Sequence, residues 1–184
     1  VIFSGVPLAK NSYKTNSGKY YVTIKADPDS IPVQPALGQH WSVKGARSIE
    51  EMETGDYVMQ QHTYESPDHI ECSLPESGEQ LIQFISKEKD FKGIGESKAR
   101  ALWGALGKDF HSILQNDTSE NRNRLRELLS DDSVESLFQG YSKYKNLAYC
   151  NWMSEKKIPA SIQQRLLKHH GHESIQAINQ NPYL

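Results

Sequence analysis

Short runs of β-branched and aromatic residues alternate with turn-forming segments over the first 75 residues. Such runs are typical of β-strands, and they lie at residues 1–4, 19–24, 40–43, 57–59 and 69–74. A hairpin turn is expected at residues 16–18, and residues 27–35 are too rich in proline for a central strand. Five short strands in this length predict a small closed OB-like barrel, because closure removes exposed sheet edges.

After Pro75 the apolar residues repeat with a period of about 3.6 instead of two. Ala99, Leu102, Trp103 and Leu106 share one helical face, and we expect that face to be buried. The same spacing continues to the end of the chain, and Gly107 and Gly171 lie where helices are expected to end. We therefore predict an α+β fold, with a β-barrel domain at residues 1–76 and a helical domain at residues 77–184.

The segment between the first two predicted helices reads FKGIGESKA, at residues 91–99. It resembles a helix-hairpin-helix motif in which Gly-Ile-Gly forms the hairpin. The glycines permit a tight turn, Ile94 fills the gap between the helices, and Ala99 lets the second helix pack closely. The free N–H groups at the start of the second helix then point outward, where they can bind a phosphate oxygen.

This motif predicts a DNA-phosphate site at Lys92, Gly93, Ile94, Gly95, Ser97 and Lys98. Such a site contacts the DNA backbone without reading bases, so its binding is independent of base sequence and falls with salt. The alternative is that the hairpin is only a compact connector between helices. Glu96 favours this alternative, because its charge opposes a bound phosphate.

Two later segments resemble degenerate copies of the motif, so the helical domain is predicted to hold tandem helix-hairpin-helix motifs. Residues 128–134 have no glycine, and their two aspartates repel phosphate, so we interpret them as structural. Residues 156–161 contain two lysines, a serine able to cap the next helix, and Pro159, which lacks an N–H group. The predicted secondary DNA contacts are Lys156, Lys157, Ser161 and Arg165.

Composition and charge narrow the class of protein. A hydrophobic content of 36% and a mean hydropathy of −0.68 exclude a membrane protein, so no membrane partner is expected. Cys72 and Cys150 lie far apart, which supports neither a disulfide framework nor a zinc site and favours the cytoplasm. The chain begins with Val1 rather than Met, which suggests that it was cut from a longer protein.

The net charge of −2 hides a difference between the halves of the chain. Residues 1–85 carry 6 Lys/Arg and 11 Asp/Glu, a sum of −5, whereas residues 86–184 carry 15 and 12, a sum of +3. Asymmetry of this sign is consistent with a polyanion-binding second half. The aromatic residues of the acidic half, including Trp41 and Tyr64, are expected in its core or rim rather than stacked on bases.

The whole chain is similar to the N-terminal region of long RecD-like helicases, superfamily 1 motors that move 5′ to 3′ on single-stranded DNA. The predicted strands, residues 38–45, residues 91–110 and the ending INQNPYL carry the resemblance. It implies a helicase motor in cis, like that of an exodeoxyribonuclease V α-subunit, and partners in DNA repair and recombination. It also implies single-stranded or forked DNA as ligand, and it leaves open whether the hairpin carbonyls hold a monovalent cation.

No catalytic constellation is evident in the chain itself. The phosphate-binding motif G-x-x-x-x-G-K-[ST] is missing, so ATP and Mg²⁺ are expected only for the motor. We interpret His169, His170 and His172 as a helix C-terminus rather than a metal site, and Asp131 and Asp132 as solvated. We expect no catalytic residue, cofactor or metal here.

Three functions remain open at this point. The first is a non-catalytic DNA-binding module of a helicase, and the second is a module that docks on the motor or a partner subunit without touching DNA. The third is a Holliday-junction binder similar to RuvA, which has a barrel followed by paired hairpins. The missing glycines near Ser130 and Ile158 argue against the third, since that family has glycine-rich hairpins.

Overall fold

The computed structural model describes residues 1–8, 20–54, 57–75, 78–170 and 173–180. The chain divides into two compact units. The first unit comprises Val1–Pro32, Ser42–Glu71 and Asn151–Leu184, and the second comprises Val33–Trp41 and Cys72–Cys150. The described residues do not include the predicted turn at residues 16–18, Gly171, His172 or the ending at residues 181–184. They also leave out residues 76–77, where the sequence places the domain boundary, so that boundary stays a prediction.

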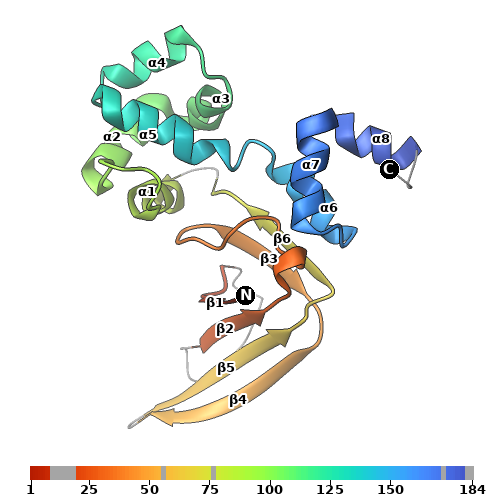
Figure 1. The fold of residues 1–184 in the computed structure, drawn as a ribbon. Helices are drawn as coiled ribbons and strands as arrows, with labels where there is room; N and C mark the ends of the chain where they lie inside the picture. The colour runs from red at the N-terminus through yellow and green to blue at the C-terminus, as the bar shows by residue number, and fades with distance from the viewer. Residues whose placement is uncertain (9–19, 55–56, 76–77, 171–172, 181–184) are drawn as a thin grey trace. The chain divides into compact units, whose positions relative to one another are not determined.

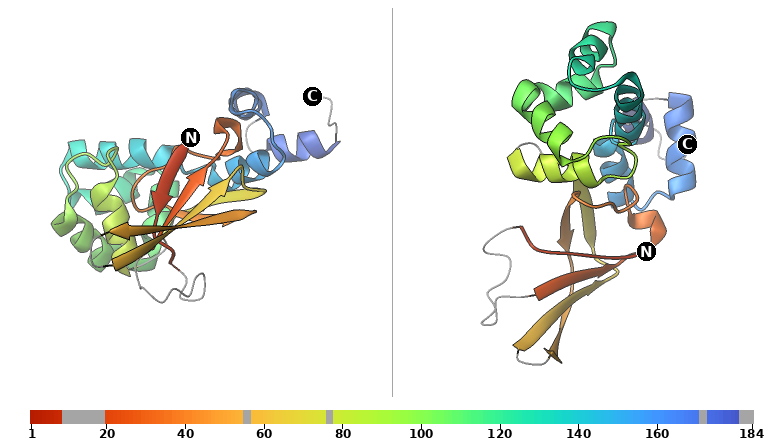
Figure 2. Two further views of the ribbon diagram at one scale, coloured as in Figure 1. Left: turned by 90° about the horizontal axis from the view of Figure 1, so that it is seen from below. Right: turned by 90° about the vertical axis from the view of Figure 1, so that its left-hand side faces the viewer.

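Six strands are described (Figure 1): β1 Ile2–Gly5, β2 Tyr20–Lys25, β3 His40–Lys44, β4 Arg47–Thr54, β5 Tyr57–Glu65 and β6 His69–Ser73. Four of them form a sheet in the order β1-β2-β5-β4, and β3 pairs with β6. Strand β2 runs antiparallel to β1 and parallel to β5, with Tyr20 opposite Gln60. Both views in Figure 2 show the strands of the larger sheet side by side. The predicted mixture of sheet and helices is therefore confirmed.

The described strands do not form the closed barrel that the sequence predicts. Strands β1 and β4 are the outer edges of the four-stranded sheet, and closure requires these two to pair. The sequence pattern also misses β4, which pairs with β5 over eight positions from Arg47 opposite Tyr64 to Thr54 opposite Tyr57. The reason is its composition: β4 reads RSIEEMET, and its Ile49 is exposed, so no apolar alternation marks the strand.

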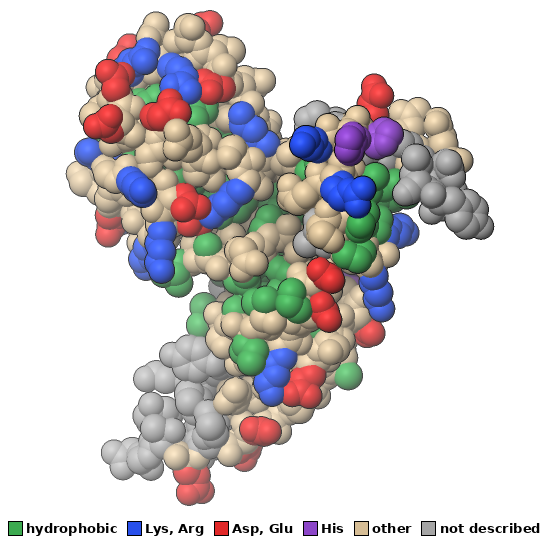
Figure 3. Space-filling model, viewed as in Figure 1, with side chains coloured by type: hydrophobic (Ala, Val, Ile, Leu, Met, Phe, Trp, Pro, Cys, Tyr) green, Lys and Arg blue, Asp and Glu red, His purple; other side chains and the backbone are tan. Residues whose placement is uncertain are grey.

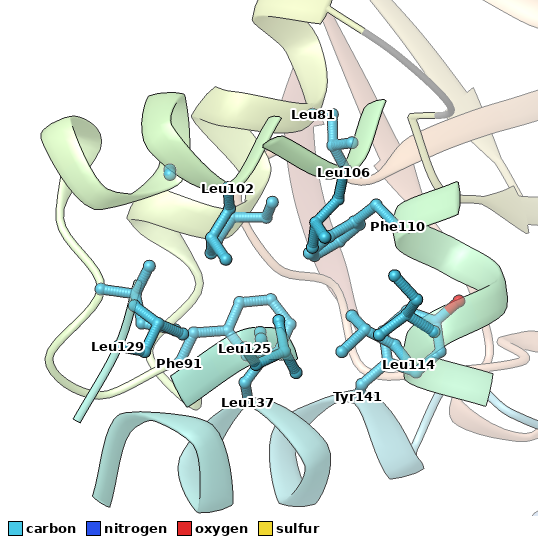
Figure 4. Close-up of a cluster of buried hydrophobic side chains, with 14 of the residues drawn as sticks. Leu81, Phe91, Leu102, Leu106, Phe110, Leu114, Leu125, Leu129, Leu137 and Tyr141 are labelled. Atoms are coloured by element: carbon cyan, nitrogen blue, oxygen red, sulfur yellow. The ribbon is translucent and has the colours of Figure 1, made fainter. Parts of the chain in front are cut away.

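The second unit holds a helical core. Its helices are α1 Gly78–Lys87, α2 Glu96–Leu106, α3 Phe110–Gln115, α4 Ser119–Arg126 and α5 Asp131–Ser142, with a 3₁₀ turn at Gly107–Asp109 between α2 and α3. Leu81, Leu102, Phe110, Leu125 and Leu137 belong to the cluster of buried side chains drawn in Figure 4. The predicted buried face of α2 is confirmed, since Ala99, Leu102 and Leu106 are buried and Trp103 packs against them. This core supports the loop between α1 and α2.

The last helices are α6 Leu147–Glu155, α7 Ala160–His170 and α8 Ser174–Gln180. The α6–α7 turn is fastened by Gln163, which is buried and donates its side-chain amide to the carbonyl of Ile158 at 2.8 Å. No described helix has both the length and the apolar character that a membrane span needs. Cys72 and Cys150 are buried and form no disulfide, and burial raises the pKa of Cys150.

Candidate functional site

Residues 88–95, which we call the first hairpin loop, connect α1 to α2. Two backbone hydrogen bonds turn the chain, from Phe91 N to the carbonyl of Glu88 (3.1 Å) and from Ile94 N to the carbonyl of Phe91 (3.3 Å). Gly93 has a φ of 78°, a conformation that side chains rarely adopt. A Cβ atom at Gly93 meets the hydroxyl oxygen of Ser133 at 2.8 Å. Glycine at this position therefore satisfies both the turn and a close approach to α5.

The residues of the predicted DNA-phosphate site divide between the surface and the core. The side chains of Phe91 and Ile94 belong to the buried cluster, so Ile94 offers only its backbone to a ligand. Gly95 is the N-cap of α2 and supplies no side-chain hydrogen bond to the helix. The first N–H groups of a helix have no partner within it, so the start of α2 presents donors beside the exposed Ser97 and Lys98.

Helix α5 holds the first hairpin loop in place through Ser136. The backbone N–H of Lys92 donates to the Ser136 hydroxyl at 2.7 Å, and that hydroxyl donates to the carbonyl of Asp90 at 2.8 Å. One turn further along α5, a Cβ atom at Gly140 meets the Phe91 ring at 2.8 Å. The loop and the helix therefore approach each other closely, and the sequence analysis did not identify Ser136 or Gly140.

A buried polar network anchors the start of the same loop. The carboxylate of Glu88 is buried, accepts a hydrogen bond from the Tyr144 hydroxyl at 2.7 Å, and pairs with Lys143 at 3.3 Å. Lys143 also pairs with Asp90 at 2.7 Å, and the side-chain amide of Gln39 donates to the Tyr144 hydroxyl at 2.9 Å. Burial, followed by the bond to Glu88, raises the pKa of Tyr144. Burying a carboxylate is costly unless it is hydrogen-bonded and paired, and Glu88 has both kinds of partner.

A cavity of about 750 Å³ lies between the first hairpin loop and α5. Its lining includes Lys92, Gly93, Lys98, Asp132, Ser133 and Ser136. The Lys98 ammonium donates to the carbonyl of Gly93 at 2.8 Å, which fixes one positive charge at the loop. The structure thus brings together three of the predicted site residues, Lys92, Gly93 and Lys98.

Acidic side chains also line this cavity, and most of them are compensated. Asp90 pairs with Lys143, and Glu135 pairs with Arg122 at 2.8 Å. Asp132 takes part in none of the ion pairs found among the described residues. Its carboxylate is therefore the main charge that opposes an anion in the cavity. The sequence analysis did not place Asp132 at the first hairpin loop, because the two are far apart along the chain.

Glu96 opposes a phosphate less than the sequence suggests. It pairs with Arg100 one turn along α2 at 2.8 Å, and Arg100 also pairs with Glu79 at 2.8 Å. The hydrogen bond from Arg100 lowers the pKa of Glu79. Arg100 is therefore already paired with two carboxylates, which reduces what it gains from an anionic ligand.

Residues 128–134 comprise the end of the connection from α4 and the first turn of α5, with Ser130 at the N-cap of α5. Asp131 pairs with Arg126 at 2.6 Å, whereas Ser133 and Asp132 face the first hairpin loop as parts of the shared cavity. The segment that the sequence marks as structural therefore forms the opposite wall of the candidate site.

Residues 156–159, which we call the second hairpin loop, connect α6 to α7 in the first unit. The N–H of Lys157 donates to the carbonyl of Ser154 (2.9 Å), and that of Ile158 donates to the carbonyl of Met153 (3.0 Å). This pair of bonds is a Schellman cap, whose C′ residue takes a positive φ. Lys157 occupies that position with a φ of 56°, so a lysine here adopts a conformation that usually favours glycine.

The secondary residues Lys156, Lys157, Ser161 and Arg165 are all exposed. The predicted capping role of Ser161 is wrong, because α7 begins at Ala160 and Ser161 lies inside the helix. Pro159 precedes the helix instead, and its carbonyl accepts from the N–H groups of Ile162 and Gln163 at 2.9 and 3.0 Å.

Comparisons with protein families, with curated proteins and with solved structures find no match to this chain. Among the described residues, no group of three or more His, Cys, Asp and Glu side chains could hold a metal ion. His172 lies outside these residues, and the expectation that the chain needs no metal or cofactor stays a prediction.

Proposed function

We propose that this chain is a non-catalytic DNA-binding module that contacts the sugar-phosphate backbone through the first hairpin loop. The observation that carries this proposal is the uncapped start of α2, which follows a glycine turn and lies beside the exposed Lys92 and Lys98. Helix N-termini attract phosphate because their N–H groups and dipole favour negative charge. In this proposal the loop and its two helices form a helix-hairpin-helix motif.

The polar groups of the site suit a phosphate better than a base. Lysine ammonium groups and backbone N–H groups carry no base information, whereas base readout needs side chains that reach groove edges. We therefore propose binding without sequence preference. Single-stranded or forked DNA is the proposed ligand, in line with the resemblance to RecD-like helicases.

The same resemblance suggests an ATP-dependent 5′–3′ motor in cis, in a protein of DNA repair and recombination. In that setting the module holds DNA near the motor and takes no part in ATP hydrolysis. Lys92 and Lys98 then supply the charge, and α5 keeps the loop in the shape that presents it.

Fluorescence anisotropy with a labelled single strand, a fork and a Holliday junction tests this function. We expect the 184-residue chain to bind at low salt. On a single strand, Lys92→Gln with Lys98→Gln should lower the salt slope by about 0.7 for each phosphate that is no longer neutralised. Asp132→Asn should raise the affinity, because it removes the opposing carboxylate of the cavity.

Lys108→Gln is the matched control, since Lys108 is exposed and follows the other end of α2. It should leave affinity and salt slope unchanged. If no DNA binds at low salt while the chain retains a separately produced motor domain on a column, the docking function is correct instead. A strong preference for the junction over the fork supports the RuvA-like function.

A further inference from the structure

We propose that α7 and the second hairpin loop form a second surface for the phosphate backbone, which supplies more of the electrostatic affinity than the first hairpin loop. We call it the α7 basic surface and define it by Lys156, Lys157, Arg165 and Lys168. This inference rests on the proposed function, because it assumes that the chain binds DNA.

The first observation is the charge of the segment. Residues 156–170 contain four Lys or Arg residues and no Asp or Glu, and Glu155 and Glu173 are the nearest acidic residues on either side. In Figure 3, blue and purple side chains gather over α7. An acid-free stretch of this length concentrates positive potential in a chain whose net charge is only −2.

The second observation is that these cations are not engaged. Within the described ranges, no ion pair involves any of the four residues of the α7 basic surface, and all four are exposed. In the second unit Arg100, Arg122 and Arg126 each pair with carboxylates, whereas Lys92 and Lys98 at the first hairpin loop form no ion pair among the described residues. A cation already bound to a carboxylate gains less from a phosphate, so the four cations of the α7 basic surface should contribute more counterion release than the two of the first hairpin loop.

The third observation is the arrangement of the charges along α7. Ser161, Arg165 and Lys168 are four and three residues apart, so they share one face of the helix. All three are exposed, while Gln163 on the other side is buried. From Ser161 to Lys168 the helix rises by about 10 Å, a length that suits more than one phosphate of a strand rather than one small anion.

Repulsion between the positive charges of the α7 basic surface affects thermal stability in a way that distinguishes a binding role from a structural one. Like charges three or four residues apart destabilise a helix, in the reverse sense of an ion pair at the same spacing. Neutralising Arg165, which lies outside the last turn of α7, should therefore leave the melting temperature equal or slightly higher. A residue that served only the fold would lower it when replaced.

The test uses the 184-residue chain and a labelled single-stranded oligonucleotide. Arg165→Gln with Lys168→Gln, and separately Lys156→Gln with Lys157→Gln, should each lower the salt slope by about 1.4, from about 0.7 for each of two phosphates no longer neutralised. The Lys108→Gln, Lys145→Gln double variant removes the same charge from exposed sites elsewhere and should change the slope by less than half as much.

The outcomes separate this inference from the proposed function. If the α7 variants bind like the unaltered chain while the Lys92 and Lys98 variant binds more weakly, this inference is wrong and the function stands. If only the α7 variants lose affinity, the inference holds and the assignment to the first hairpin loop fails. If poly-glutamate competes as well as DNA at equal charge, the surface fits an acidic protein and the inference is overturned.

Discussion

The two hairpin loops share a backbone design but differ in what surrounds it. Each has a residue at positive φ followed by an isoleucine, Gly93 with Ile94 in the first and Lys157 with Ile158 in the second. The first loop is held by α5, and its acidic neighbours Asp90 and Glu96 pair with Lys143 and Arg100. The lysines of both loops are exposed and form no ion pair among the described residues, but only the second loop lies in a stretch without acidic residues. The comparison shows that the first loop combines a fixed shape with two unpaired lysines, whereas the second is less enclosed and leads into a longer basic segment.

The largest expected difference lies in the two isoleucines. Ile94 is 3% exposed and belongs to the main core, so Ile94→Ala should lower the free energy of unfolding by about 2–4 kcal/mol. Ile158 is only half-buried, and Ile158→Ala should cost less than half as much. Urea denaturation of both variants measures this, and equal losses would contradict the contrast between the loops.

The close approach of α5 to the first hairpin loop predicts that Gly140→Ala lowers the free energy of unfolding, although the same substitution usually stabilises a helix. Gly140→Ala improves helix propensity by about 1 kcal/mol, but its Cβ meets the Phe91 ring at 2.8 Å and Asp90 Cβ at 3.0 Å. Overpacking costs about 1–3 kcal/mol, so we expect a net loss of about 1 kcal/mol by thermal or urea unfolding.

Gly104→Ala is the matched control for this prediction. Gly104 lies inside α2, and a Cβ atom there meets nothing within 4 Å. This variant should gain about 0.5–1 kcal/mol, as helix propensity alone predicts. If Gly140→Ala gains as much as Gly104→Ala, α5 does not fix the position of the loop.

Substitutions at the two residues with positive φ should change the free energy of unfolding in opposite directions. Gly93→Ala should lose about 1–2 kcal/mol, because a side chain is disfavoured at its φ of 78°. Lys157→Gly relieves the same strain at a φ of 56° and should gain up to about 1 kcal/mol, less the entropy of glycine in the unfolded chain. Differential scanning calorimetry checks both signs, and a loss in Lys157→Gly would show that the lysine side chain stabilises the second loop.

The smallest effect concerns the ion pairs of the second unit at acid pH. Hydrogen bonds from Arg122 lower the pKa of both Asp117 and Glu135. Their contribution is therefore complete above the unfolded pKa values near 4 and is lost as the pH falls through the lower folded values. Arg122→Gln should make stability fall less between about pH 5 and pH 2, as followed by circular dichroism. An unchanged acid profile would mean that these exposed pairs contribute nothing measurable.

The sequence predicted the helical core well because its apolar spacing is regular. The buried face of α2 and the burial of Ile94 follow from a period of about 3.6 and a glycine turn. Strand β4 was missed because six of its eight residues are polar or charged, which leaves no apolar alternation to detect. The open sheet could not be predicted either, since strand order depends on pairing between residues far apart in the chain.

By itself the sequence determined the α+β composition, the helical core, the glycine turn before α2 and the distribution of charge, because all of these are local properties of neighbouring residues. Only the tertiary structure decided which charges are free. It brought Asp132, Ser136 and Gly140 of α5 against the first hairpin loop, and it paired Arg100 and Arg122 with carboxylates. It also left the cations of α7 without such partners among the described residues. The physical reason is that an ion pair or a close approach depends on distance in space, which the linear order of residues does not fix.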